Sequence, residues 1–241
     1  MKSIAIVLAA GSGKRMQSAT KKQFMLVHEK PVLYYSLKAF EDSFVDNVII
    51  VASKDDEAYI REDIINKYKF TKVISIVEGG AERYHSVLFG LREIERIFAT
   101  DDAYVFVHDG ARPMIDQDIL GRALEAVKEF DACVVGMPSK DTVKIANENG
   151  MVVSTPKRDL VWTIQTPQVF RFNLIKEAYE DVISREEELK AQGISITDDA
   201  MVLEISSNHP IKLVEGSYQN IKVTTPDDLP VLEDFLKKFG Q

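Results

Sequence analysis

Cysteine is almost absent from this sequence. Cys133 is the only one in 241 residues, which excludes an intrachain disulfide. Because it lies in the apolar run ACVVGM, we expect a buried and unreactive thiol. The four histidines lack the spacing of metal ligands, so no zinc site is predicted. No Gly-x-Ser-x-Gly elbow and no Cys/His pairing occurs either, so nothing indicates covalent catalysis.

Long apolar runs are also missing. The apolar stretch near the start is short and leads directly into a Gly-Lys-Arg loop, so we interpret it as a core strand and not as a signal peptide. We therefore expect a cytoplasmic protein without membrane association. Positive charge is in short supply as well, since 30 Lys and Arg stand against 38 Asp and Glu, for a net charge of -8. This balance argues against a nucleic-acid or membrane-surface binder, although a locally positive pocket could still hold a small anion.

The sequence does carry the pattern of an α/β domain. Hydrophobic residues make up 45% and charged residues 28%, and the length suits one large domain. Five short, nearly continuous apolar runs predict strands covered on both faces, at 3–9, 47–53, 72–78, 103–109 and 132–138. Helical periodicity lies between them, at 30–43, 81–98 and 116–130. This alternation predicts a doubly wound, mainly parallel sheet.

After Pro138 the pattern changes. Residues 139–160 alternate polar and apolar side chains around Asn149-Gly150, which is typical of a hairpin and not of a strand-helix-strand unit. We expect this segment to be a β-arm that projects from a single domain spanning 1–241. The rest of the chain predicts a helix over 173–193, strands at 211–216 and 220–225, and a last helix over 227–239.

The opening loop, LAAGSGKRM at 8–16, follows the first predicted strand. In an open parallel sheet this turn is a common ligand site, and glycines let the backbone approach phosphates closely. The dinucleotide fingerprint fails because Met16 stands in place of its third glycine, and the P-loop fails because Arg15 follows Gly-Lys. Four cations nonetheless gather here, namely Lys14, Arg15, Lys21 and Lys22. They favour anion binding over the alternative of a tight turn with solvated basic residues.

Three further stretches are candidates for ligand contacts. Asp109 ends a predicted strand beside Gly110, where a carboxylate could hold Mg²⁺ bound to phosphates, or could instead cap a turn and pair with Arg112. Ser86 follows a glycine pair in the first turns of a predicted helix and could reach a ligand. Lys222 lies among apolar neighbours, where only a ligand would make it more than an edge residue.

Eight motifs together resemble the 2-C-methyl-D-erythritol 4-phosphate cytidylyltransferase family in order and spacing, from residue 4 to about 236. They are LAAGSGKRM, KKQF, GGAERYHSV, VHDGARP, KDTVK, TPQVF, ITDDA and VEGSYQNIKVTTPDDL. The resemblance implies a Rossmann-like nucleotidyltransferase core with a β-arm that interlocks two subunits of a homodimer. It implies that CMP is transferred from CTP to methylerythritol phosphate with Mg²⁺, releasing pyrophosphate, in non-mevalonate isoprenoid biosynthesis.

The same resemblance implies roles for individual residues. The cations expected to stabilise charge during the reaction are Arg15, Lys22 and Lys222. The nucleotide would be bound by Ala10, Gly11, Ser12, Gly13, Gly80, Ser86 and Asp109. The sugar-alcohol phosphate would be bound by Asp109, Thr142, Arg158, Thr166, Thr197 and Lys222, with Thr142 and Arg158 reaching the partner subunit from the arm. Asp109 is also the one expected metal contact, mostly by way of CTP phosphates.

Two positions depart from the family pattern. Ala81 replaces an acidic or polar residue near the nucleotide, so no contact is expected there. Lys21 replaces a proline, which leaves two lysines that could point into the site. We choose Lys22 because Gln23-Phe24 follows it as in the family.

Two other functions compete with this interpretation. A ribitol-5-phosphate cytidylyltransferase shares the fold and chemistry, but KDTVK and ITDDA look more like the methylerythritol family. A non-catalytic nucleotide-binding module would be expected to lose its cations, yet Arg15, Lys22, Arg158 and Lys222 are all present. A phosphate-monoester nucleophile is already anionic and needs no general base, so positioning and cations suffice for catalysis.

Overall fold

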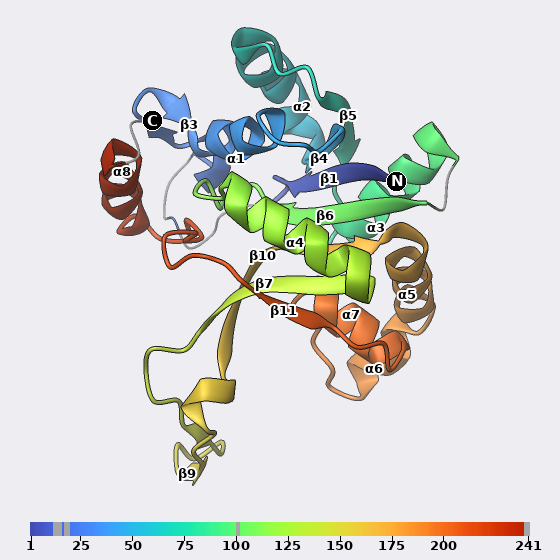
Figure 1. Cartoon of the computed structure of the whole chain (residues 1–241), viewed down its shortest axis with the longest axis vertical. Helices are drawn as coiled ribbons and strands as arrows, with labels where there is room; N and C mark the ends of the chain where they lie inside the picture. Colours follow the sequence, from blue (N-terminus) through green and yellow to red (C-terminus); the bar gives the residue numbers. More distant parts are fainter. Residues whose placement is uncertain (12–15, 17–19, 100–101, 239–241) are drawn as a thin grey trace.

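The computed structural model describes residues 1–11, 16, 20–99 and 102–238. Its centre is a seven-stranded sheet in the order β11-β7-β10-β6-β1-β4-β5 (Figure 1). The strands are β1 (Lys2–Leu8), β4 (Asn47–Ala52), β5 (Val73–Glu78), β6 (Ala103–Asp109), β7 (Ala132–Pro138), β10 (Trp162–Arg171) and β11 (Lys212–Glu215). Neighbours pair in parallel except β10, which is antiparallel to both β6 and β7. The predicted mainly parallel α/β fold is confirmed.

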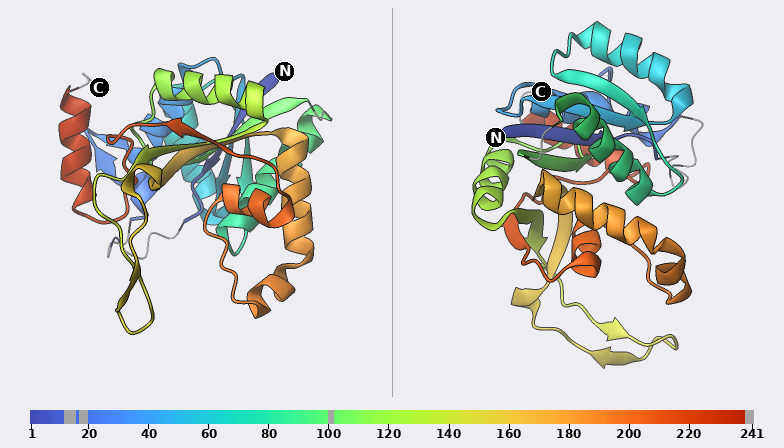
Figure 2. Two further views of the ribbon diagram at one scale, coloured as in Figure 1. Left: turned by 60° about the horizontal axis from the view of Figure 1, so that its bottom comes forward. Right: turned by 90° about the vertical axis from the view of Figure 1, so that its right-hand side faces the viewer.

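Helices cover both faces of this sheet (Figure 2). They are α1 (Val32–Glu41), α2 (Glu57–Tyr59) with a π-helical continuation (Ile60–Asn66), α3 (Arg83–Phe98), α4 (Gln117–Phe130), α5 (Phe172–Ser184), α6 (Glu186–Ala191), α7 (Asp199–Ser206) and α8 (Asp228–Lys238). One apolar core joins the sheet to α1 and α4, and a second joins its other face to α3, α5 and α7. A third, smaller core packs α8 against the short hairpin of β2 (Leu26–Val27) and β3 (Lys30–Pro31). None of the helices in the described ranges has the length and apolar content to cross a bilayer.

Most predicted elements are present, and the exceptions have local causes. The predicted strand at 220–225 is wrong, because this segment bonds to the loop after β6, where Val223 N–H donates to the Ala111 carbonyl at 2.8 Å. The predicted helix 173–193 breaks at Arg185, whose ψ of 16° lies outside the helical region. The short α7 was not predicted. Its N-cap is Asp198, whose carboxylate accepts the Met201 N–H.

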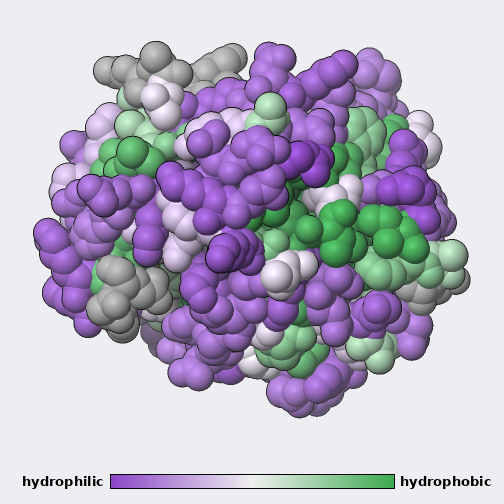
Figure 3. All heavy atoms as spheres, turned by 90° about the horizontal axis from the view of Figure 1, so that it is seen from above, coloured by the Kyte–Doolittle hydropathy of each residue, from purple (hydrophilic) through white to green (hydrophobic). Residues whose placement is uncertain are grey.

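The segment 139–160 contains β8 (Ile145–Ala146) and β9 (Val152–Ser154), which pair antiparallel. The expected turn lies between them, with Gly150 at φ 76°. In Figure 1 this pair lies below the main sheet, and Figure 2 shows the same separation in both views. Its exposed large apolar side chains are Ile145, Met151, Val152, Val153 and Leu160. The face seen in Figure 3 is mostly hydrophilic, with some apolar areas between the polar side chains.

Candidate active site

The parallel pairing of β1 and β6 brings two loops to one edge of the sheet. Leu8 is the register partner of Asp109, so the first loop and the VHDGARP loop begin side by side. A cavity of about 390 Å³ opens there, which we call the first cavity. Its lining includes Ala10, Gly11, Lys22, Gly80, Ser86, Asp109 and Lys222. These residues come from widely separated parts of the chain. Five of them were expected at the nucleotide, whereas Lys22 and Lys222 were expected as cations of the reaction and Lys222 also at the sugar-alcohol phosphate.

A second cavity of about 300 Å³ lies beside the first. Its lining includes Arg112, Ile164, Gln165, Thr166, Gln168, Thr197 and Asp198. Three residues line both cavities, namely Arg83, Asp109 and Lys222. The site therefore consists of two compartments that meet at a charged junction.

The glycine pair before α3 shapes one wall of the first cavity. A Cβ on Gly79 would lie 2.6 Å from the Ala10 Cβ, so only glycine allows this loop to pack against the first loop. The Gly80 N–H donates to Ser86 Oγ at 3.1 Å. Ser86 thus fixes the loop as well as lining the cavity.

The two adjacent lysines point to different places. Lys21 Nζ forms an ion pair with Asp56 at 2.6 Å and also bonds to Ser53, whereas Lys22 lines the first cavity. The next residue, Gln23, is 2% exposed and its amide donates to the carbonyls of Ala9 (2.6 Å) and Gly11 (3.1 Å). Its supporting role was not predicted from the sequence, although the KKQF motif contains it.

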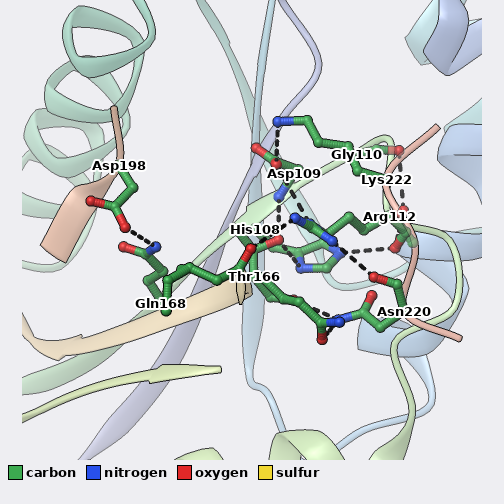
Figure 4. A network of polar contacts seen from close by, with 12 residues as sticks. His108, Asp109, Gly110, Arg112, Thr166, Gln168, Asp198, Asn220 and Lys222 are labelled. Atoms are coloured by element: carbon green, nitrogen blue, oxygen red, sulfur yellow. Dashed lines mark hydrogen bonds and ion pairs between the residues drawn. The ribbon is translucent and has the colours of Figure 1, made fainter. Parts of the chain in front are cut away.

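Asp109 is the centre of the charged junction (Figure 4). Lys222 Nζ lies 2.7 Å from its Oδ2, Arg83 Nε lies 3.6 Å from its Oδ1, and Arg112 Nε lies 3.7 Å from its Oδ2. Burial alone would raise the pKa of Asp109, but the three cations outweigh burial and hold that pKa well below its usual range. The carboxylate is therefore ionised throughout the physiological pH range.

Arg83 also forms an ion pair with a buried carboxylate that was not predicted from the sequence. Its two terminal nitrogens each lie 2.7 Å from an oxygen of Asp199, which has no exposed surface. The hydroxyl of Tyr179 donates to the same carboxylate. Burial lowers the pKa of Arg83, but the Asp199 charge and hydrogen bonds outweigh burial and raise it well above the ordinary value. The only signal in the sequence was the ITDDA motif, which places Asp199 next to an N-cap.

The remaining predicted residues fall into three groups. Thr166 and Thr197 line the second cavity. Thr142 and Arg158 are exposed on the segment 139–160 and line neither cavity of this chain. Three residues lie outside the described ranges, namely Ser12, Gly13 and Arg15.

The donor set tests whether the chain itself could hold a divalent cation. Within the described ranges, no group of three or more His, Cys, Asp or Glu side chains converges. At the junction Asp109 is a single carboxylate among three cations. Such a set fits Mg²⁺ only if phosphate oxygens of a ligand supply most of the coordination, which is a common arrangement for this ion.

Comparisons with known proteins place the chain in one family. The sequence model of the family described as 2-C-methyl-D-erythritol 4-phosphate cytidylyltransferase (IspD) matches residues 3–238. A protein of that name from Lachnoclostridium phytofermentans is 51% identical over 97% of this chain and 96% of its own length. Another from Lachnospira eligens is 48% identical over 97% of this chain and 98% of its own. A crystal structure of 4-diphosphocytidyl-2C-methyl-D-erythritol synthase from Anaerococcus prevotii superposes with a TM-score of 0.83 at 33% identity, covering 98% of this chain and 96% of that one.

Proposed function

The chain belongs to the 2-C-methyl-D-erythritol 4-phosphate cytidylyltransferase family, and from this premise we propose how its residues carry out the reaction. It is a nucleotidyltransferase that transfers CMP from CTP to 2-C-methyl-D-erythritol 4-phosphate, with release of pyrophosphate, in isoprenoid biosynthesis. One observation supports the assignment of its site: two cavities share Arg83, Asp109 and Lys222 at their junction. A two-substrate transfer needs such a meeting point.

CTP occupies the first cavity in this proposal. Its base and ribose lie against Ala10, Gly80 and Ser86, and its phosphates lie against the backbone of the opening loop, with Gly11, Ser12 and Gly13. Glycine has no side chain, so the backbone at the glycines of the opening loop and at the glycine pair can approach a ligand closely. The cations expected at the α-phosphate are Arg15, Lys22 and Lys222.

The polyol phosphate occupies the second cavity, against Thr166 and Thr197. A phosphate monoester oxygen attacks the α-phosphorus in line and pyrophosphate departs, so negative charge accumulates on the phosphoryl oxygens. Lys22 and Lys222 stabilise that charge, and Asp109 holds Lys222 at the junction. A fixed cation of this kind typically contributes about 10²–10³ to the rate.

Mg²⁺ completes the proposed reaction. It would be held mainly by CTP phosphate oxygens, with Asp109 as the one carboxylate of the junction able to add a ligand. When bound, the ion neutralises charge on the triphosphate and favours departure of pyrophosphate.

The segment 139–160 acts in this proposal as the arm of a cytoplasmic homodimer. Five exposed apolar side chains lie within it, which is more than a solvated hairpin needs. Thr142 and Arg158 are exposed and line neither cavity of their own chain, so they would bind the polyol phosphate in the partner's second cavity.

A substrate panel tests the proposed function. Pyrophosphate release is measured with CTP, Mg²⁺ and either 2-C-methyl-D-erythritol 4-phosphate or ribitol 5-phosphate. We expect turnover with the first compound and at most trace turnover with the second. Turnover with ribitol 5-phosphate alone would refute the substrate, and CTP binding without turnover on either would favour a nucleotide-binding module.

A further inference from the structure

His108 is fully buried near the end of β6, and the reaction outlined above does not use it. Its ring packs edge-to-face on Phe40, with ring centroids 5.3 Å apart. Nε2 lies 3.1 Å from the carbonyl oxygen of Arg112, and Nδ1 lies 3.0 Å from Thr166 Oγ1. Both ring nitrogens therefore have a polar partner, as Figure 4 shows.

These partners determine which atom carries each hydrogen. A carbonyl oxygen only accepts, so Nε2 must carry a hydrogen and donate it to Arg112. No carboxylate is among the hydrogen-bond partners of the ring in the described ranges, and an imidazolium buried without one is costly. The ring is therefore neutral, Nδ1 accepts, and the Thr166 hydroxyl donates its hydrogen to His108.

Thr166 also accepts a hydrogen bond on its other side. The Asp109 N–H lies 3.1 Å from Thr166 Oγ1, beyond the last β6–β10 register pair at Val107 and Gln168. The hydroxyl thus accepts a backbone N–H that the ladder between β6 and β10 does not pair. Thr166 Oγ1 donates its only hydrogen to His108, and one of its two lone pairs accepts the Asp109 N–H. Only the second lone pair is left for a ligand in the second cavity, which Thr166 lines.

We propose that His108 is a positioning residue that fixes the Thr166 hydroxyl as a hydrogen-bond acceptor for a hydroxyl group of the polyol substrate. A phosphate oxygen only accepts and cannot bond to an oxygen whose hydrogen is committed elsewhere, whereas a polyol hydroxyl can donate to it. Thr166 therefore recognises the polyol chain and not its phosphate. This inference rests on the proposed function, which places the polyol phosphate in the second cavity.

Two substitutions separate the two hydrogen bonds of His108. His108→Asn keeps a carbonyl oxygen near the position of Nδ1 and can still accept from Thr166, whereas His108→Gln keeps an N–H near the position of Nε2 and loses that acceptor. We expect His108→Gln to raise the KM for the polyol phosphate about tenfold, and His108→Asn to raise it no more than about threefold. The KM for CTP should change less than that for the polyol phosphate in both variants. Equal polyol KM values in the two variants would overturn the proposal.

The Asn and Gln substitutions of His108, repeated in a Thr166→Val background, test whether His108 acts through Thr166. Valine keeps the shape of threonine but removes the hydroxyl, so the difference between the Asn and Gln variants should disappear. A difference that persists unchanged would show that His108 acts through general packing and would contradict the proposal. Thr166→Ser, which keeps the hydroxyl, should preserve the difference.

A measurement on the unmodified protein keeps the test valid if a variant fails to fold. Long-range ¹H–¹⁵N NMR distinguishes the tautomers of the four histidines. We expect His108 to be the neutral form protonated at Nε2, and an Nδ1-protonated ring or an imidazolium would overturn the proposal. Wild-type turnover with the polyol phosphate is measured separately. If that turnover is absent while the tautomer is as expected, the proposed function fails and the hydrogen-bond chain stands.

Discussion

Lys222 Nζ lies 2.7 Å from Asp109 Oδ2, so a cation from the carboxy-terminal loop and a carboxylate from the end of β6 meet where the two cavities join. The contact fixes a flexible side chain beside the point where both substrates would lie. A cation held in this way is organised before charge develops in the transition state.

Replacing that cation should affect the chemical step more than nucleotide binding. We expect Lys222→Ala to lower kcat by about 10²–10³, because a charge stabiliser of the transition state is lost. CTP affinity, measured by calorimetry, should fall much less. Lys128→Ala is a matched control, since Lys128 forms an exposed ion pair with Glu125 on α4. A kcat close to that of the wild type would contradict the assigned role of Lys222.

The adjacent lysines offer an internal comparison. Lys22 lines the first cavity, whereas Lys21 is paired with Asp56. We expect Lys22→Ala to reduce turnover by about 10². Lys21→Ala should leave turnover within about threefold and cost at most about 1 kcal/mol of stability, because the side chain of Lys21 is partly exposed. Steady-state kinetics on both variants measures turnover, and urea unfolding measures the change in stability. A larger loss of turnover in Lys21→Ala than in Lys22→Ala would refute the choice of Lys22.

The Asp199–Arg83 pair should behave as a buried ion pair that supports the junction. Asp199→Asn removes the charge and leaves the Arg83 guanidinium without its main partner, so we expect a loss of about 3 kcal/mol in the free energy of unfolding. Tyr179→Phe removes one hydrogen bond to the same carboxylate and should cost about 1 kcal/mol. Denaturant unfolding at pH 7 provides both values. If Asp199→Asn were no more destabilising than Tyr179→Phe, the ion pair with Asp199 would not be what stabilises the Arg83 guanidinium in the folded protein.

The sequence predicted the parts of this site that have a local signature. The glycine pair before α3 and Asp109 at the end of β6 were identified because the spacing of glycines and strand ends limits where a ligand can approach. Gln23, Arg83 and Asp199 were missed because their roles depend on contacts with distant parts of the chain. Arg83 and Asp199, for example, are separated by 116 positions in the sequence.

The same distinction explains the errors in the fold. Several core strands were predicted because they are short, nearly continuous apolar runs, and the longer helices were predicted because their apolar side chains recur at helical spacing. The segment at 220–225 also alternates, but in the described structure its backbone joins no strand ladder and is tied instead to the loop after β6: Arg112, for example, donates to the Asn220 carbonyl at 2.8 Å. Alternation alone cannot distinguish a strand from an extended loop that binds a neighbouring loop.

His108 should make the stability of the protein depend on pH. Burial lowers its pKa from the ordinary 6.5 to about 4. As the pH falls below 6.5, the unfolded chain therefore binds a proton that the folded protein does not, and stability decreases until the pH reaches about 4. We expect a loss of about 2 kcal/mol from this group between pH 7 and pH 5. The free energy of unfolding of His108→Gln, measured over the same range, should lack that decrease, and parallel curves would show that His108 does not titrate as described.

The proposed exchange of arms between subunits can be tested by mixing two inactive variants. Arg158→Ala should lose turnover because the arm no longer binds the polyol phosphate. Lys222→Ala should lose turnover because the core no longer has this cation at the junction. If each site combines the core of one chain with the arm of the other, a mixed dimer has one site with both residues intact and one with neither. After unfolding and refolding together in equal amounts, about half the dimers are mixed, so about a quarter of wild-type activity should return. If Arg158 served its own chain, every site would lack one residue and no activity would return, whatever the oligomeric state.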